Sequence, residues 1–189
     1  MRRVILQEFV SLDGHAAASD GSVDFVPAAM SGDQSFGQRQ LGFIDSVDTM
    51  LLGRKTYELF AGHWPNVTSG EDRDFAEKIN ALNKVVFSTT LDRAPWGKFP
   101  PARIVKGNPA AEVARLKKER GKDMVLWGSL SIAQALARDG VIDDYQLIIC
   151  PIVFGSGKPL FSDSAKPRDL KLRSTRPFDR GAVLLDYQP

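Results

Sequence analysis

Short apolar segments alternate with segments of helical periodicity along most of this chain. We expect strands at residues 3–10, 49–52, 84–88, 103–105, 124–127 and 145–153, and helices at 33–46, 53–60, 69–82, 108–120 and 131–137. Alternating strands and helices are typical of a mainly parallel sheet covered by helices. The last two strands, 170–175 and 182–187, have no helix between them and are expected to pair antiparallel. The pattern predicts an α/β fold with a mixed, mostly parallel sheet.

The starts of two helices can be predicted from local signals. Asn108 followed by Pro109 combines a preferred N-cap residue with proline at the first helical position. Ser69 and Asp72 have the spacing of a capping box, so we expect the helix 69–82 to begin at Ser69. Residues 11–27 are expected to form a loop.

Composition places the chain among ordinary globular proteins. Of its 189 residues 43% are hydrophobic and 25% charged, which favours one domain over residues 1–189. The net charge of +2 is too small to indicate a nucleic-acid partner or a membrane surface. The single cysteine, Cys150, excludes an internal disulfide.

The first apolar run is too short for a targeting segment. Val4, Ile5 and Leu6 are followed at once by Gln7 and Glu8, whereas a secretory signal needs roughly 7–15 apolar residues. No segment of the sequence reaches the roughly 18 apolar residues of a membrane-spanning helix. We therefore expect a cytoplasmic protein without a membrane partner.

Several familiar kinds of site are disfavoured by the sequence. The two histidines, His15 and His63, have no metal-ligand spacing, so we expect no metal. A Gly-x-Ser-x-Gly elbow and a Gly-x-Gly-x-x-Gly turn are both missing. The segment Gly155–Lys158 lacks the earlier glycine and the Ser or Thr that a phosphate loop requires.

Two glycine turns, each between a strand and a helix, are the strongest candidates for binding. Gly53-Arg54-Lys55-Thr56 follows one strand and Gly128-Ser129 follows another. Such turns leave backbone N–H groups unpaired, and Arg54 adds a guanidinium suited to phosphate. Ser88-Thr89-Thr90 places three hydroxyls at a third strand end. Each turn alone is better explained by an ordinary cap, whereas the three features together favour a phosphate-binding site.

Motifs spread over nearly the whole chain resemble one family. The sequence resembles the stand-alone dihydrofolate-reductase-like proteins related to the reductase domain of riboflavin biosynthesis. The motifs that carry the resemblance are Ser11-Leu12-Asp13-Gly14, Asp20-Gly21-Ser22-Val23-Asp24, Leu52-Gly53-Arg54-Lys55-Thr56-Tyr57-Glu58, Trp64-Pro65, Val86-Phe87-Ser88, Trp127-Gly128-Ser129, Ile142-Asp143-Asp144 and the stretch from Pro151 to Phe161.

The resemblance implies a dihydrofolate reductase-like, three-layer α/β/α fold that binds NADPH, and a homodimer. It assigns Gly53, Arg54 and Thr56 to a first phosphate-binding turn, and Ser88 and Thr89 to the strand end near the adenosine 2′-phosphate. The second phosphate-contacting turn, by the same resemblance, comprises Gly128, Ser129 and Leu130.

The substrate half of the site differs from the family patterns. Dihydrofolate reductases carry a carboxylate on the first long helix, where this chain has Asp33 and Asp45 without a matching motif. The riboflavin enzymes usually have a basic residue at the position of His15, and the second turn often has paired glycines where this chain has Ser129. Four aromatic residues either line a pocket for a planar ring or belong to the core: Phe36, Phe43, Trp64 and Trp127.

The expected activity is NADPH-dependent reduction of a small heterocyclic C=N or C=O compound, resembling 5-amino-6-(5-phosphoribosylamino)uracil reductase. The alternatives are dihydrofolate reductase activity and a catalytically silent nucleotide-binding protein. Asp13 follows the first strand directly, and we expect it to act as proton donor or polar anchor in the substrate half. His15 competes for the proton-transfer role because its ordinary pKa, near 6.5, suits that role better. A turn in which Asp13 caps its own backbone is the structural alternative.

Overall fold

The computed structural model describes residues 1–161 and 167–189. Its strands are β1 (Val4–Ser11), β2 (His15–Ala17), β3 (Val47–Gly53), β4 (Asn83–Phe87), β5 (Arg103–Val105), β6 (Asp123–Trp127), β7 (Asp144–Cys150), β8 (Lys158–Pro159), β9 (Lys171–Pro177) and β10 (Val183–Gln188). Its helices are α1 (Phe25–Met30), α2 (Gln34–Ile44), α3 (Arg54–His63), α4 (Arg73–Ala81), α5 (Pro109–Leu116) and α6 (Leu130–Arg138), with a short 3₁₀ turn at Trp64–Asn66. None of these helices is long and apolar enough to cross a membrane.

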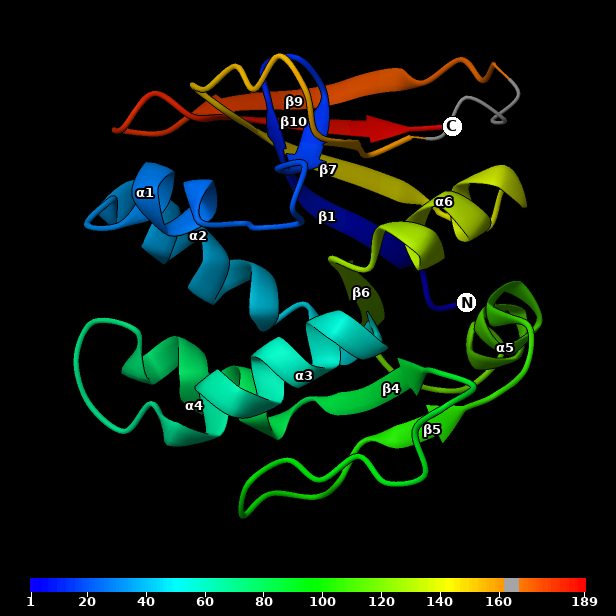
Figure 1. The fold of residues 1–189 in the computed structure, drawn as a ribbon. Coiled ribbons are helices and arrows are strands. Elements are labelled where there is room, and N and C mark those ends of the chain that lie inside the picture. Colours follow the sequence, from blue (N-terminus) through cyan, green and yellow to red (C-terminus); the bar gives the residue numbers. More distant parts are fainter. Residues whose placement is uncertain (162–166) are drawn as a thin grey trace.

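Eight of the described strands form one sheet in the order β5-β4-β3-β6-β1-β7-β10-β9 (Figure 1). Neighbouring strands are parallel from one edge of the sheet through β5, β4, β3, β6, β1 and β7. The strand β10 runs antiparallel to both of its neighbours, β7 and β9. The strands β2 and β8 form a separate antiparallel pair. The predicted mixed, mostly parallel sheet with an antiparallel pair at the end of the chain is therefore confirmed.

Helices cover both faces of the sheet and give the molecule three layers (Figure 1). One face packs against α5 and α6, where Val113 and Leu136 contact the core residues of β1 and β6. The other face packs against α2, α3 and α4 through Ile44, Tyr57 and Ile79. Because the central strands are buried on both faces, they are almost continuously apolar in sequence.

One group of buried polar side chains lies between α2 and the centre of the sheet, and its members bond to one another. Gln7 on β1 donates to Gln40 on α2 (3.1 Å) and to Gln146 on β7 (3.0 Å). It accepts a hydrogen bond from the indole nitrogen of Trp127 (2.8 Å). The network fixes α2 against the centre of the sheet, since a buried amide without partners costs free energy.

The expected loop over residues 11–27 is wrong in part. Residues 15–17 form β2, which pairs with β8, and Phe25–Met30 forms α1. Pro27 is the third residue of that helix, where its missing N–H removes no intrahelical hydrogen bond. Pro27 is therefore compatible with α1, although the sequence analysis places this residue at the end of a loop.

Further element boundaries also differ from the prediction, and two of them have a clear local cause. The helix expected at Ser69 begins at Arg73, because Gly70 adopts a left-handed φ of 85° that interrupts a helix. The strand expected to reach residue 153 ends at Cys150, and Pro151, which has no N–H to donate to a strand ladder, follows. The predicted start of α5 is confirmed, since the Asn108 side chain accepts hydrogen bonds from two backbone N–H groups of that helix.

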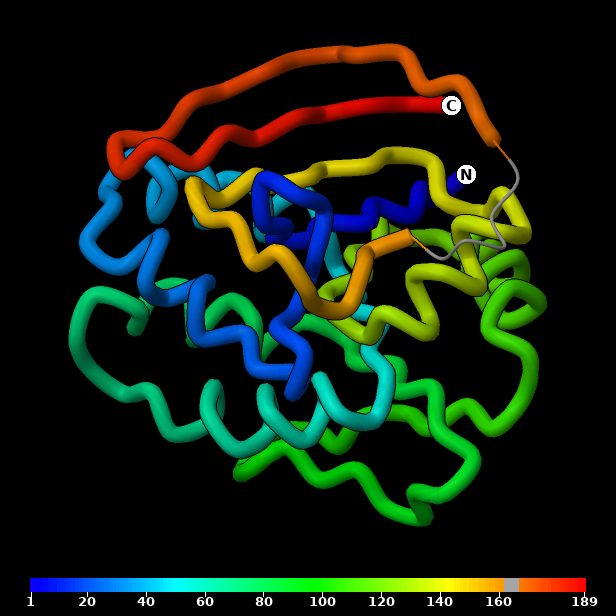
Figure 2. Tube along the Cα trace, turned by 45° about the horizontal axis from the view of Figure 1, so that its top comes forward, coloured from blue at the N-terminus to red at the C-terminus, as the bar shows by residue number. Residues whose placement is uncertain are grey.

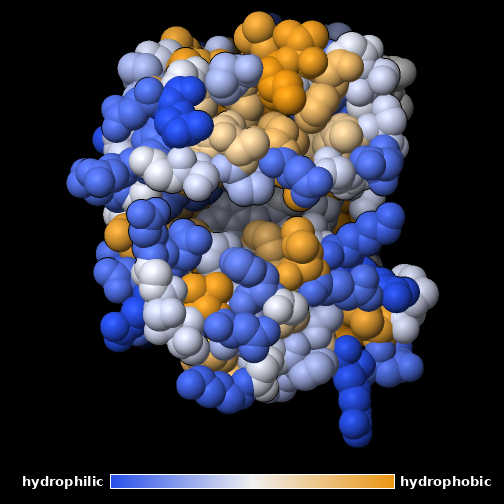
Figure 3. Space-filling view, turned by 60° about the vertical axis from the view of Figure 1, so that its left-hand side comes forward, coloured by the Kyte–Doolittle hydropathy of each residue, from blue (hydrophilic) through white to orange (hydrophobic). Residues whose placement is uncertain are grey.

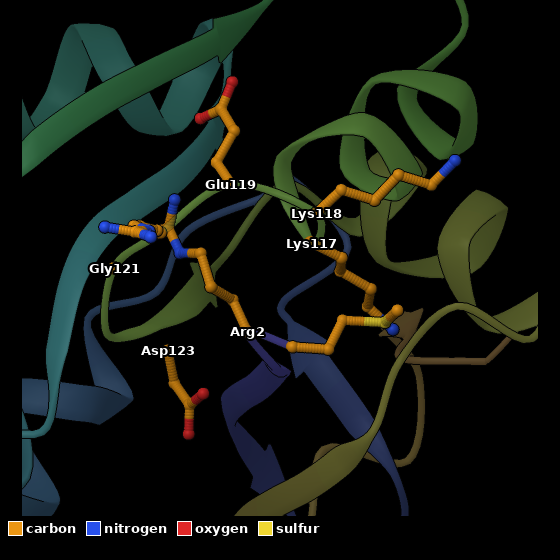
Figure 4. A pocket seen from close by; sticks show the side chains of 8 residues that line it. Arg2, Lys117, Lys118, Glu119, Gly121 and Asp123 are labelled. Atoms are coloured by element: carbon orange, nitrogen blue, oxygen red, sulfur yellow. The ribbon is translucent and has the colours of Figure 1, made fainter.

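A surface pocket of about 600 Å³ lies at the amino-terminal edge of the sheet (Figure 4). Arg2 lines it, yet the Arg2 guanidinium is already bound to Asp48 and Thr49 and to the backbone carbonyl of Lys122. The side chains of Lys118 and Glu119 point in different directions rather than toward a common point (Figure 4). This pocket therefore offers no converging chemical groups for a ligand.

The cap of α5 provides a stability test. Replacing Asn108 by Ala removes hydrogen bonds to the N–H groups of Ala110 (2.8 Å) and Ala111 (3.2 Å). We expect Asn108→Ala to lower the free energy of unfolding by about 1 kcal/mol, measured by urea denaturation. Asn108→Ser keeps a capping oxygen and should stay within about 0.5 kcal/mol of the wild type. An equal loss in both variants would rule out capping as the cause.

Candidate functional site

The two glycine turns lie side by side at the carboxyl edge of the sheet. Gly53 ends β3, Gly128 follows β6, and these two strands are direct neighbours. The Ser129 hydroxyl accepts a hydrogen bond from the Gly53 backbone N–H and donates one to the Thr56 hydroxyl (2.9 Å). The structure therefore brings together four of the residues predicted to bind phosphate.

The turns are packed so closely that their shape is fixed. A Cβ atom at Gly128 would lie 2.7 Å from Thr56 Oγ1, and Gly128 also has a left-handed φ of 58°. A Cβ atom at Gly53 would lie 2.8 Å from the Ser129 hydroxyl. Ser129 is the one non-glycine residue of the described ranges with positive φ. Strain of this kind persists only where the surroundings enforce it and is frequent at binding sites.

Each turn leads into a helix whose first backbone N–H groups have no partner within the helix. The helix α3 begins at Arg54 and α6 begins at Leu130. The Leu130 side chain packs against the apolar core, so only its backbone can serve a ligand. Two adjacent helix starts that are free of acidic residues in their first turns form a suitable place for an anion.

Arg54 extends from the first turn toward the end of β4. Its Nη1 donates to the Thr90 hydroxyl (3.0 Å), and its Nε lies 2.7 Å from Glu58 one helical turn away. The Ser88 hydroxyl lies 3.4 Å from that of Thr90. Of the predicted strand-end residues, Ser88 is thus close to Arg54 through Thr90, whereas Thr89 is exposed and makes no described side-chain hydrogen bond. Arg54 with two hydroxyls suits an exposed phosphate group.

Asp13 joins two loops that are distant in sequence. Its carboxylate accepts hydrogen bonds from the Ser11 hydroxyl (2.7 Å) and from the backbone N–H groups of Phe154 (3.2 Å) and Gly155 (2.7 Å). These two segments run side by side in Figure 2. The Ser11 hydroxyl and the two N–H groups hold the pKa of Asp13 well below its usual range. His15 Nδ1 lies 3.4 Å from the same carboxylate.

The aromatic residues that were candidates for a pocket belong mainly to the core. Phe43 and Trp127 are buried and contact one another edge to face. Phe36 packs edge to face between Phe9 and Phe178. Trp64 is half-buried and packs against neighbouring aromatic rings.

The two carboxylates of the first long helix region have structural partners. Asp33 caps α2 by accepting from the Phe36 N–H (2.9 Å), and it also accepts from the Arg180 N–H (2.8 Å). Asp45 is exposed and pairs with Lys78. Both carboxylates are therefore engaged by other groups of the protein and are not free to bind a heterocyclic ligand.

One residue was missed by the sequence reasoning. Glu8 on β1 is 8% exposed and lies beside Gly128, since the parallel register pairs Gln7 with Trp127. Burial raises the pKa of its carboxyl group to about 8. The signal in the sequence was an acidic residue inside an apolar strand, a position where charge is rare unless it is used.

A hollow crosses the surface on the side of α1, α2, α3 and α4 (Figure 3). Apolar patches lie above and below it, while hydrophilic residues dominate the outer rim (Figure 3). A concave surface with mixed polarity is the usual setting of a small-molecule site. The hollow is the candidate cleft for a substrate.

The chain is similar to known proteins over nearly its whole length. The model of the RibD C-terminal domain matches residues 2–184. The uncharacterized protein YyaP of Bacillus subtilis is 34% identical over 187 residues, which cover 98% of this chain and 94% of YyaP. A pyrimidine reductase-like protein from Corynebacterium diphtheriae has a similar structure, with a TM-score of 0.72, 17% identity and coverage of 99% and 91% of the two chains.

Dihydrofolate reductase from Enterococcus faecalis, solved as a complex with NADP(H), has the same fold at lower similarity. Its TM-score is 0.62 with 12% identity, and 98% of this chain and 95% of that chain are covered. The predicted dihydrofolate reductase-like fold is thereby confirmed. By sequence, the chain belongs to the family of the RibD C-terminal domain.

Proposed function

We propose that this protein is an NADPH-dependent reductase of a small heterocyclic compound with a C=N or C=O bond. The observation that carries the proposal is the Ser129 hydroxyl, which bonds to Gly53 and Thr56 and so ties the second glycine turn to the first, with two helix starts at one edge. Membership of a reductase-domain family supports the same reaction class. The nicotinamide cofactor would supply the hydride, and the protein would supply orientation and a path for the proton.

Different residues of the site would bind different parts of NADPH. The N–H groups at the starts of α3 and α6 would hold the pyrophosphate. Arg54, Ser88 and Thr90 would hold the 2′-phosphate that distinguishes NADPH from NADH, because a guanidinium with hydroxyls matches a dianion. The hollow of Figure 3 would receive the substrate.

Two alternatives are separated from this proposal by measurement. Dihydrofolate reduction gains no support from Asp33 and Asp45, whose carboxylates are engaged by backbone groups and by Lys78. A catalytically silent protein would bind NADPH and turn over no compound in a screen of pterins, pyrimidines and small carbonyl compounds. NADPH titration followed by that screen therefore tests the enzyme proposal.

Arg54 provides the sharpest test of cofactor choice. We expect Arg54→Ala to weaken NADPH binding about ten- to a hundred-fold, because a charge-assisted contact is worth roughly 1.5–3 kcal/mol. NADH binding should change little. Fluorescence titration with both cofactors measures the two dissociation constants.

Arg73 offers a matched control for this experiment. It is an exposed helical arginine that pairs with a glutamate one turn on, as Arg54 does, but it lies on α4 away from the glycine turns. Arg73→Ala should leave both dissociation constants unchanged. Equal weakening of NADPH and NADH by Arg54→Ala would assign Arg54 to the pyrophosphate or to local structure.

Asp13 acts, in this proposal, as the polar anchor rather than as the proton donor. A carboxylate with a lowered pKa gives up its proton far below neutral pH, so it has none to donate during turnover. His15, 3.4 Å away, is the better placed group for proton transfer. Asp13 would hold the loop of Phe154 and Gly155 beside the end of β1.

Acid unfolding tests the anchor. The pKa of Asp13 is lower in the folded protein than in the unfolded chain, so the carboxylate stabilises the fold above about pH 4 and this stabilisation is lost as the pH falls. Asp13→Asn should therefore have a lower urea midpoint than the wild type at pH 7. The difference should narrow steadily toward pH 2. A difference that stays constant over this range would contradict the anchoring role.

We keep the homodimer as a proposal that rests on the family resemblance. Light scattering on the purified protein distinguishes the 20.8 kDa chain from a dimer of twice that mass.

A further inference from the structure

Glu8 is a buried acid in apolar surroundings. Its side chain lies between those of Leu6 and Val10, on the same face of β1 as both, because residues two apart in a strand share a face. This face packs against α6, and Leu6 and Val10 belong to the apolar core. Its side chain is 8% exposed, and its Oε2 atom has no hydrogen-bond partner among the described residues. A buried carboxyl oxygen without a partner is costly, and the folding of the chain alone gives no reason for it.

The position of Glu8 connects it to the second glycine turn. The pairing of Gln7 with Trp127 sets Glu8 directly beside Gly128, where β6 ends and the turn begins. The backbone N–H groups of Gly128 and Phe9 face the carboxyl group. A group bound at the turn would therefore lie near Glu8, whose side chain is itself buried.

Charged side chains do not account for the state of this carboxyl group. Burial raises its pKa, and the two backbone N–H groups oppose the increase only in part. The titratable and charged side chains on β1 and on the elements packed around it make no contribution to this pKa. On those elements they are His15, Asp123, Arg138, Asp144, Tyr145, Cys150 and Lys158, and Arg3 directly precedes β1.

We propose that Glu8 couples cofactor binding to a proton, so that the Gly128–Ser129 turn accepts the pyrophosphate of NADPH only while Glu8 is neutral. This inference rests on the proposed function. An ionised Glu8 would place a buried negative charge beside the phosphates, and buried like charges repel strongly because little water screens them. The neutral acid removes this repulsion, and Glu8 acts here as a positioning residue rather than a catalytic one.

The direction of the pH dependence follows from linkage. With a pKa of about 8 in the free protein, Glu8 is neutral at pH 7 and ionised at pH 9. Binding of the anionic cofactor at pH 9 then requires uptake of one proton. The dissociation constant of NADPH should rise about ten-fold between pH 7 and pH 9, as expected when only the protonated form binds.

Glu8→Gln isolates this effect, because glutamine has the shape of the neutral acid and does not ionise. The variant should bind NADPH at pH 7 like the wild type, and its dissociation constant should lack the ten-fold rise. Lys84, whose pKa is lowered to about 8 by burial, titrates in both proteins and cancels in the comparison. A parallel rise in the wild type and in Glu8→Gln would overturn the proposal.

Asp186→Asn is a matched control variant. Asp186 lies on β10, away from the turns, and it is also an acid with an unpartnered buried oxygen and a pKa raised mainly by burial. This variant should keep the pH dependence of the wild type. Loss of the pH dependence in both variants would assign it to general destabilisation and contradict the role of Glu8.

Calorimetry on the wild-type protein tests the same point without a variant. Titration with NADPH at pH 8.5, in two buffers of different ionisation enthalpy, should show net proton uptake, and uptake should vanish at pH 6.5 to 7. Binding without uptake at pH 8.5 would overturn the coupling. If NADPH does not bind at pH 7 at all, the proposed function fails, and that outcome is distinct from binding without a proton.

Discussion

The hydroxyl of Ser129 is the contact on which the proposed cofactor site depends. It spans the gap between the ends of two neighbouring strands and ties the Gly53 turn, Thr56 and the start of α6 together. Two features go with this contact: the left-handed backbone conformation of Ser129 and the close approach of Gly128 to Thr56, which leaves no room for a side chain at position 128. The positions of both helix starts follow from this single bridge, because neither turn can shift without breaking it.

The features that the sequence predicts well are those that local rules determine. The glycine turns could be found because a strand, a glycine and a helix follow one another within a few residues, and the cap at Asn108 could be found for the same reason. The mixed, mostly parallel sheet with its antiparallel pair at the end of the chain also follows from the alternation of elements and from the last two strands, which have no helix between them.

The features that escaped prediction depend on contacts between distant parts of the chain. Thr90 rather than Thr89 meets Arg54, which depends on how far the chain turns after β4. Glu8 becomes significant only through its register with β6, which places it beside Gly128. The helix α1 was missed because the expected loop extends to Pro27, although proline is compatible with a first helical turn.

The hydrogen bonds between Asp13 and the backbone of Phe154 and Gly155 have a consequence for how the chain folds during synthesis. The partners of Asp13, Phe154 and Gly155, are more than 140 residues further along the chain, and β7, which precedes them, must first dock beside β1. The glycine turns, by contrast, come from a segment that ends near residue 138. During synthesis the edge formed by the glycine turns is therefore complete in sequence before the residues that bond to Asp13 are made, and contacts of such long sequence separation form late.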